Sequence, residues 1–154
     1  MPVTLRAAYN NATSRLADVT QDMLDLYNVV QQLNGTTGTG LGYVTGQGVG
    51  GAVTQITSRS TGVTLSKLTG TITGINTSLA ANAQAEFVVT NTLVAITDTV
   101  NISVVSGPTA ATSIFTVSGV TNGSFTIRIS NVSTTTADTG APIINFTVIK
   151  GANT

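Results

Sequence analysis

The sequence predicts a mainly β protein, an antiparallel β-sandwich or jelly roll preceded by one long N-terminal α-helix and a Gly-rich arm. Three observations support this prediction. Apolar residues recur at helical spacing up to Leu33, a Gly-rich stretch follows, and the remainder alternates apolar and polar residues in short runs. We therefore divide the chain into an N-terminal helix at residues 1–34, an arm or linker at residues 35–52 and a β-sandwich domain at residues 53–154.

The first segment carries an apolar seam that advances in alternating steps of four and three residues. The seam residues are Leu5, Tyr9, Ala12, Leu16, Val19, Met23, Leu26, Val30 and Leu33. A seam with a period of about 3.5 residues is typical of helices that pack along copies of themselves. Thr4 is a suitable N-cap, and Asn34 with Gly35 forms a stop because glycine accepts the left-handed conformation. The seam therefore predicts a self-association helix over residues 4–33.

This helix needs a partner surface. Polar residues such as Asn10 and Asn11 are mediocre helix formers, so the isolated helix is expected to be marginal in water. We favour a trimeric bundle, and the alternative is packing on the β-domain of the same or a neighbouring subunit. A membrane-surface helix is disfavoured because Asp18, Asp22 and Asp25 lie where lysine or arginine would be needed.

The second segment, from Gly35 to Gly51, is Gly-rich and indicates a flexible connector or an extended arm that contacts a neighbouring subunit or a capsid. Gly46, Gly48 and Gly51 match the pattern G-x-G-x-x-G. A dinucleotide site needs that pattern between a strand and a helix, whereas here a Gly-rich connector precedes it and a β-like run follows. No nucleotide site is therefore predicted.

The third segment contains about eight short runs of β character. In the clearest run, Phe125, Ile127 and Ile129 alternate with polar residues, which is typical of a half-buried strand. Further runs lie near residues 53–57, 63–65, 71–75, 87–89, 100–104, 113–118 and 144–148. Asn122 and Gly123 between two runs predict a hairpin. Strands without intervening helices predict an antiparallel sandwich or jelly roll.

Composition narrows the classes of function. Only 8% of the residues are charged, the formal net charge is zero, and the chain has neither Cys nor His. These counts remove disulfides, thiolate nucleophiles and histidine general bases. A neutral surface rich in Thr and Ser favours permanent residence in a larger complex, with a secreted Thr-rich β-domain as the alternative. The N-terminus does not resemble a signal peptide and no run reaches the length of a membrane span, so export and membrane insertion are not expected.

Few side chains are candidates for chemistry. Glu86 and Asp98 are the one carboxylate pair to consider for glycoside hydrolysis, and Asp98 with Asp138 for a cation. We interpret all three as exposed strand-end or loop charges. No enzyme activity, cofactor or metal is therefore expected. Nucleic-acid binding is disfavoured because the charge is balanced and the aromatic residues lie on strand patterns. Those aromatic residues are Phe87, Phe115, Phe125 and Phe146.

One block carries a family resemblance. Residues 50–73, G-G-A-V-T-Q-I-T-S-R-S-T-G-V-T-L-S-K-L-T-G-T-I-T, resemble a β-domain that recurs in virion structural proteins of tailed bacteriophages. The resemblance continues through residues 79–81 and 87–91 and ends with residues 144–150. It implies a component of the phage particle, either a capsid decoration (cement) protein or a fibre-type protein. Such domains are commonly trimeric, and the pattern carries no catalytic residues.

We therefore expect a homotrimeric capsid decoration protein on the virion surface, made in the host bacterial cytoplasm. Its partners would be its own copies and the major capsid protein or another virion component, with no nucleic acid and no membrane. The alternative is a receptor-binding or adhesin module of a head or tail fibre, in which the loops Gly107–Ser113 or Ser133–Ala141 bind host carbohydrate. A depolymerase is a third option.

Overall fold

The computed structural model describes Thr20, Gln21, Met23, Leu24, Tyr43 and residues 48–152. The chain divides into two compact units, residues 1–45 and residues 46–154. In the first unit, the four described residues between positions 20 and 24 are helical. The rest of the helix predicted over residues 4–33 lies outside the described residues.

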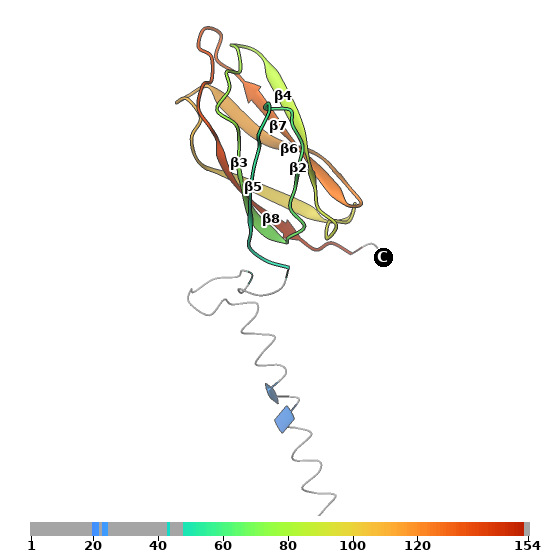
Figure 1. The fold of residues 1–154 in the computed structure, drawn as a ribbon. Helices are drawn as coiled ribbons and strands as arrows, with labels where there is room; N and C mark the ends of the chain where they lie inside the picture. Colours follow the sequence, from blue (N-terminus) through green and yellow to red (C-terminus); the bar gives the residue numbers. More distant parts are fainter. Residues whose placement is uncertain (1–19, 22, 25–42, 44–47, 153–154) are drawn as a thin grey trace, which may run out of the picture. The chain divides into compact units, whose positions relative to one another are not determined.

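The described residues of the second unit, 48–152, form eight strands in two four-stranded sheets (Figure 1). Sheet A has the order β1 (Ala52–Thr54), β3 (Thr69–Thr73), β8 (Ile143–Ile149) and β5 (Thr99–Ser106). Sheet B has the order β2 (Val63–Thr64), β4 (Gln84–Thr90), β7 (Ser124–Asn131) and β6 (Ser113–Thr121). Each of the eight predicted runs overlaps one of these strands, so the mainly β class is confirmed.

The expectation of wholly antiparallel pairing is wrong for two pairs. Strand β1 is parallel to β3, and β2 is parallel to β4, whereas the remaining pairs are antiparallel. The first five strands alternate between the two sheets. A chain that crosses between sheets at each loop reverses direction twice before it returns, so its next strand in the same sheet runs parallel to the last. Alternating sequence patterns do not distinguish such crossings from hairpins.

One apolar core lies between the two sheets. The ring of Phe125 in sheet B and the ring of Phe146 in sheet A have centroids 5.3 Å apart and are tilted by 55°. The other fully covered core residues include Ile72, Phe87, Val89, Ile127, Ile129, Ile144 and Val148. They come from alternate positions of both sheets, so each sheet buries one face against the other in a sandwich-like arrangement.

Gly70 in β3 is paired with Phe146 in β8. A Cβ atom at Gly70 would lie 2.8 Å from a carbon of the Phe146 ring and 2.6 Å from Cδ2 of Leu65. The aromatic ring therefore occupies the space that a side chain on β3 would take.

The hairpin predicted at Asn122 and Gly123 is confirmed, and it joins β6 to β7. Gly123 has a φ of 83°, in the left-handed region that favours glycine. The turn is fixed to the loop between β4 and β5, because Gly123 N donates to Val94 O (2.9 Å) and Gly123 O accepts from Asn91 N (2.8 Å).

Candidate functional site

The predicted interface seam is largely outside the described residues. Met23 is described, is helical and is 67% exposed. Its off-seam neighbour Leu24 is also 49% exposed, so exposure alone does not identify the packing face. The seam stays a prediction. The remaining seam residues, which lie outside the described residues, are Leu5, Tyr9, Ala12, Leu16, Val19, Leu26, Val30 and Leu33.

The C-terminal end of the predicted arm lies along β3 of its own chain. Gly48 O accepts from Leu68 N (2.6 Å), and Gly51 O accepts from Thr71 N (2.9 Å). Gly50 N donates to the side chain of a β3 threonine. This end is therefore part of the β-domain, and contact with a neighbour remains a prediction for the arm before it.

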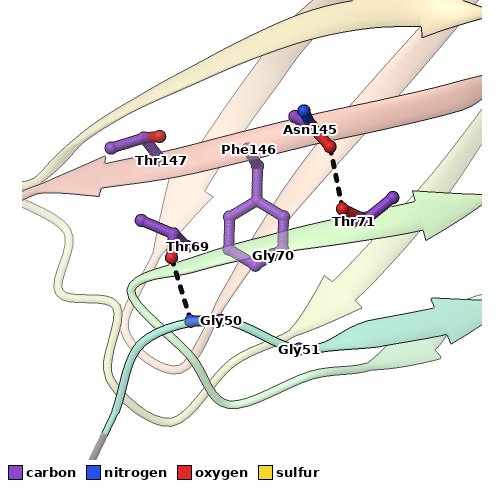
Figure 2. Close-up of a pocket in the computed structure, with 8 residues that line it drawn as sticks. All are labelled: Gly50, Gly51, Thr69, Gly70, Thr71, Asn145, Phe146 and Thr147. Atoms are coloured by element: carbon purple, nitrogen blue, oxygen red, sulfur yellow. Dashed lines mark hydrogen bonds between the residues drawn. The ribbon is translucent and has the colours of Figure 1, made fainter. Parts of the chain in front are cut away.

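A hollow of about 270 Å³ opens where this segment meets sheet A. Its lining consists of Gly50, Gly51, Thr69, Gly70, Thr71, Asn145, Phe146 and Thr147 (Figure 2). Two hydrogen bonds join residues of the lining, from Gly50 N to Thr69 Oγ1 (3.0 Å) and from Thr71 Oγ1 to Asn145 Oδ1 (2.8 Å). The lining carries no charge, so it offers hydroxyl, amide and backbone groups to a neutral polar surface.

The hollow belongs to a wider uncharged face. The described strands of sheet A read AVT, TGTIT, TVNISVVS and IINFTVI, without a charged residue. Across the sheet, Asn101 lies opposite Thr147, and Ser103 lies opposite Asn145. Sheet B differs because β4 and β7 carry Glu86 and Arg128. A partner can cover the outer face of sheet A without removing ions from water, which is the expensive step in burying a polar surface.

A buried arginine holds the loops at one end of the β-domain. Arg59 is 4% exposed, and its Nη1 lies 3.3 Å from Oδ2 of Asp138, which is fully buried. Arg59 Nε donates to Thr77 O (2.6 Å), and Nη2 donates to Gly140 O (2.8 Å). The guanidinium thus joins the loops that follow β1, β3 and β7.

Asp138 extends this network to the loop that follows β5. Its carboxylate accepts from Ser113 Oγ (2.6 Å), Thr109 N (2.9 Å) and Gly140 N (3.1 Å). Burial alone raises the pKa of Asp138, but these hydrogen bonds and the charge of Arg59 outweigh it, so the pKa lies below the ordinary 3.8. The expectation of a solvated loop carboxylate is therefore wrong for Asp138, because an arginine distant in the sequence pairs with it.

Asp98 also departs from the expected exposed strand end. Its side chain is fully covered, and Oδ2 accepts from Lys150 Nζ (2.6 Å) and Ala95 N (2.8 Å). Gly151 N donates to Oδ1 (3.0 Å). Burial alone raises the pKa of Asp98, but the hydrogen bond from Lys150 and those from the backbone outweigh this effect. The pKa of Asp98 therefore lies below the ordinary 3.8. The side chain of Lys150 remains 50% exposed.

Glu86 is exposed as predicted. It lies 2.7 Å from Arg128 Nε on sheet B, and both side chains are nearly half exposed. Hydrogen bonds from Ser118 and then from Arg128 lower the pKa of Glu86. Glu86 and Asp98, the candidate hydrolytic pair, each face a separate cation. Within residues 48–152 and the few described residues before them, no group of three or more carboxylates gathers as a metal site.

The polar residues of the resembling block shape loops. Gln55 is 3% exposed and donates from Nε2 to Thr61 O (2.8 Å), and Asn91 donates from Nδ2 to Lys67 O (2.6 Å). Together with Arg59, these side chains are internal hydrogen-bonding groups. The buried polar residues of the block therefore specify the loops of a β-domain. Sequence reasoning missed this role, although a single arginine in a Ser- and Thr-rich loop is a signal for it.

No protein-family model, curated protein or solved structure matches the chain. Among the described residues, no helix is long and apolar enough to cross a membrane.

Proposed function

We propose that the protein is a virion structural protein, a homotrimeric capsid decoration (cement) protein that stabilises a phage head. The observation that carries the proposal is the uncharged outer face of sheet A, with its rows of Thr, Ser and Asn side chains. The resemblance of residues 50–73 supports the same assignment. The proposal includes a long N-terminal helix over residues 4–33 whose seam forms the trimer.

The proposed mechanism is mass action. A protein that binds only the assembled shell stabilises the shell in proportion to its occupancy. Three linked copies raise the effective concentration of each remaining contact once the first has formed. The neutral face keeps the cost of each contact low because no ion loses its water.

The trimer is tested by light scattering with size-exclusion chromatography on the full chain. We expect the mass of three chains, and a loss of the trimer when Leu16→Asp and Leu26→Asp are combined. A stable trimer in the double variant would refute the seam as the interface.

Head binding is tested by co-sedimentation of the full chain with undecorated heads of the phage that encodes it. We expect binding of the unmodified chain and at least tenfold weaker binding of Asn101→Lys, which places a charge on the outer face of sheet A. The matched control is Thr90→Lys on sheet B, which is expected to bind normally. Absence of binding by the unmodified chain at micromolar concentration would overturn the proposal.

A receptor-binding module is the second candidate, and one observation favours it. The loops Gly107–Ser113 and Ser133–Ala141 are fixed to each other through Asp138, which accepts from Thr109 and Ser113. Loops that are ordered before binding lose less entropy when a ligand binds. A glycan array separates the candidates: saturable binding to host carbohydrate without affinity for heads would favour the receptor-binding module.

A further inference from the structure

Strand β5 forms one free edge of sheet A. Among the described strands it pairs only with β8. Its sequence, TVNISVVS, has no charged residue, proline or glycine. Val104 and Val105 are 41% and 57% exposed. Proteins normally protect an edge from pairing with other strands by charges, prolines, bulges or a very short strand.

The other edges of the two sheets carry such protection. β1 has three residues and β2 has two. β6 is interrupted by a register shift between Val117 and Gly119. The shift in β5 lies between Val104 and Ser106, near the end of the strand, and leaves Thr99–Val104 in regular register. β5 thus offers the longest regular edge among the described strands.

The backbone of β5 presents hydrogen-bonding groups away from its own sheet. Val148 N donates to Leu68 O (2.7 Å), so the backbone groups of Val148 face the β3 side of β8. Because these directions alternate along an antiparallel strand, Thr147 faces β5 and bonds its partner Asn101. The β5 residues whose N–H and C=O groups point away from β8 are then Val100, Ile102 and Val104.

We propose that this edge is an interface at which a second copy of the chain adds its own β5, antiparallel, to form a continuous eight-stranded sheet. The free backbone groups require an extended strand as partner. Antiparallel pairing of a short strand with itself brings a charged side chain near the centre of the strand close to its own copy, and like charges held close together across two strands are unfavourable. A strand without charges meets no such penalty. A two-fold contact uses the same β5 edge on both copies, so neither β5 edge remains free.

The pairing is expected to be weak. Six residues of strand bury less than the roughly 1,200 Å² of a standard stable interface. Association therefore requires high concentration, or other contacts that hold copies close together. The inference does not depend on the virion proposal.

Sedimentation velocity of the full chain over a wide concentration range tests the pairing. We expect the unmodified chain to form a species of twice its low-concentration mass, and Ser103→Lys and Ser103→Glu each to lose it. An equimolar mixture of the two variants restores association if β5 meets β5, because opposite charges then lie near each other across the two strands. The matched control is Thr54→Lys, an exposed position on β1 of the same sheet.

Amide hydrogen exchange gives an independent readout. The amides of Ile102 and Val104 are expected to become protected as concentration rises in the unmodified chain, but not in Ser103→Lys. Val104→Pro removes an outward N–H without touching the β8 ladder and is expected to abolish association. The proposal is overturned if the mass does not depend on concentration, if the mixture fails to associate, or if Thr54→Lys is equally disruptive.

Discussion

The two ends of the β-domain use ion pairs in different ways. At the end where β5 finishes, Arg59 and Asp138 are 4% and 0% exposed and join four loops. At the end where β5 begins, Asp98 is buried but Lys150 is 50% exposed. If either Arg59 or Asp138 is removed, the remaining charge stays buried away from water. If Asp98 is removed, the charge of Lys150 is already half exposed and is solvated by water. We therefore expect the first end to be far more sensitive to substitution.

The largest effect is expected for Asp138→Asn, which leaves the Arg59 guanidinium buried without a counter-charge. Removing one partner of a buried pair costs about 3–5 kcal/mol of the free energy of unfolding. Chemical denaturation measures this loss. The control is the double variant Arg59→Met with Asp138→Asn, which removes both charges and is expected to recover part of the loss. A single-variant cost below about 1 kcal/mol would contradict the description of this end.

Asp98→Asn is expected to cost less, about 1–2 kcal/mol in the free energy of unfolding. Ala95 N and Gly151 N donate to different oxygens of Asp98, so the single amide oxygen of asparagine keeps one of these two hydrogen bonds, and Lys150 turns into water. The same denaturation experiment measures this cost. A loss as large as that of Asp138→Asn would remove the difference between the two ends.

Acid pH affects both buried aspartates. Both aspartates have a pKa below 3.8 in the folded chain, so the folded state binds fewer protons than the unfolded state as pH falls. Their contribution to stability is complete above the unfolded-state pKa of about 3.9 and is lost as pH falls through the lower folded-state pKa. We expect little change between pH 8 and pH 5 and a decline below about pH 4. Asp138→Asn is expected to flatten that decline, as thermal unfolding across pH can show.

The strands were predictable because their signals are local. Alternation of Phe125, Ile127 and Ile129 with polar residues identifies β7, and Asn122–Gly123 identifies its hairpin. The burial of Asp138 was not predictable, because a carboxylate in a polar loop has the same local sequence whether or not Arg59, 79 residues away, reaches it. The parallel pairs depend on chain crossings that leave no local pattern.

The candidate site likewise has one part that the sequence predicts and one part that only the structure reveals. The seam of residues 5–33 is a periodic signal that sequence alone provides, and most of it lies outside the described residues. The uncharged face of sheet A emerges only from the register that brings Asn101, Thr147 and Thr69 into one row. Each strand is unremarkable alone, since short strands without charges are common in a chain with 8% charged residues.

The smallest effect is expected for Glu86→Gln, which removes the ion pair with Arg128 on sheet B. Both side chains are nearly half exposed, so water replaces each partner and salt screens their attraction. We expect no measurable change in the denaturation midpoint, at low or high salt. A loss comparable with that of Asp98→Asn would show that exposure does not govern the strength of these pairs. The order of the three substitutions, from Asp138 through Asp98 to Glu86, therefore tests burial as the common cause.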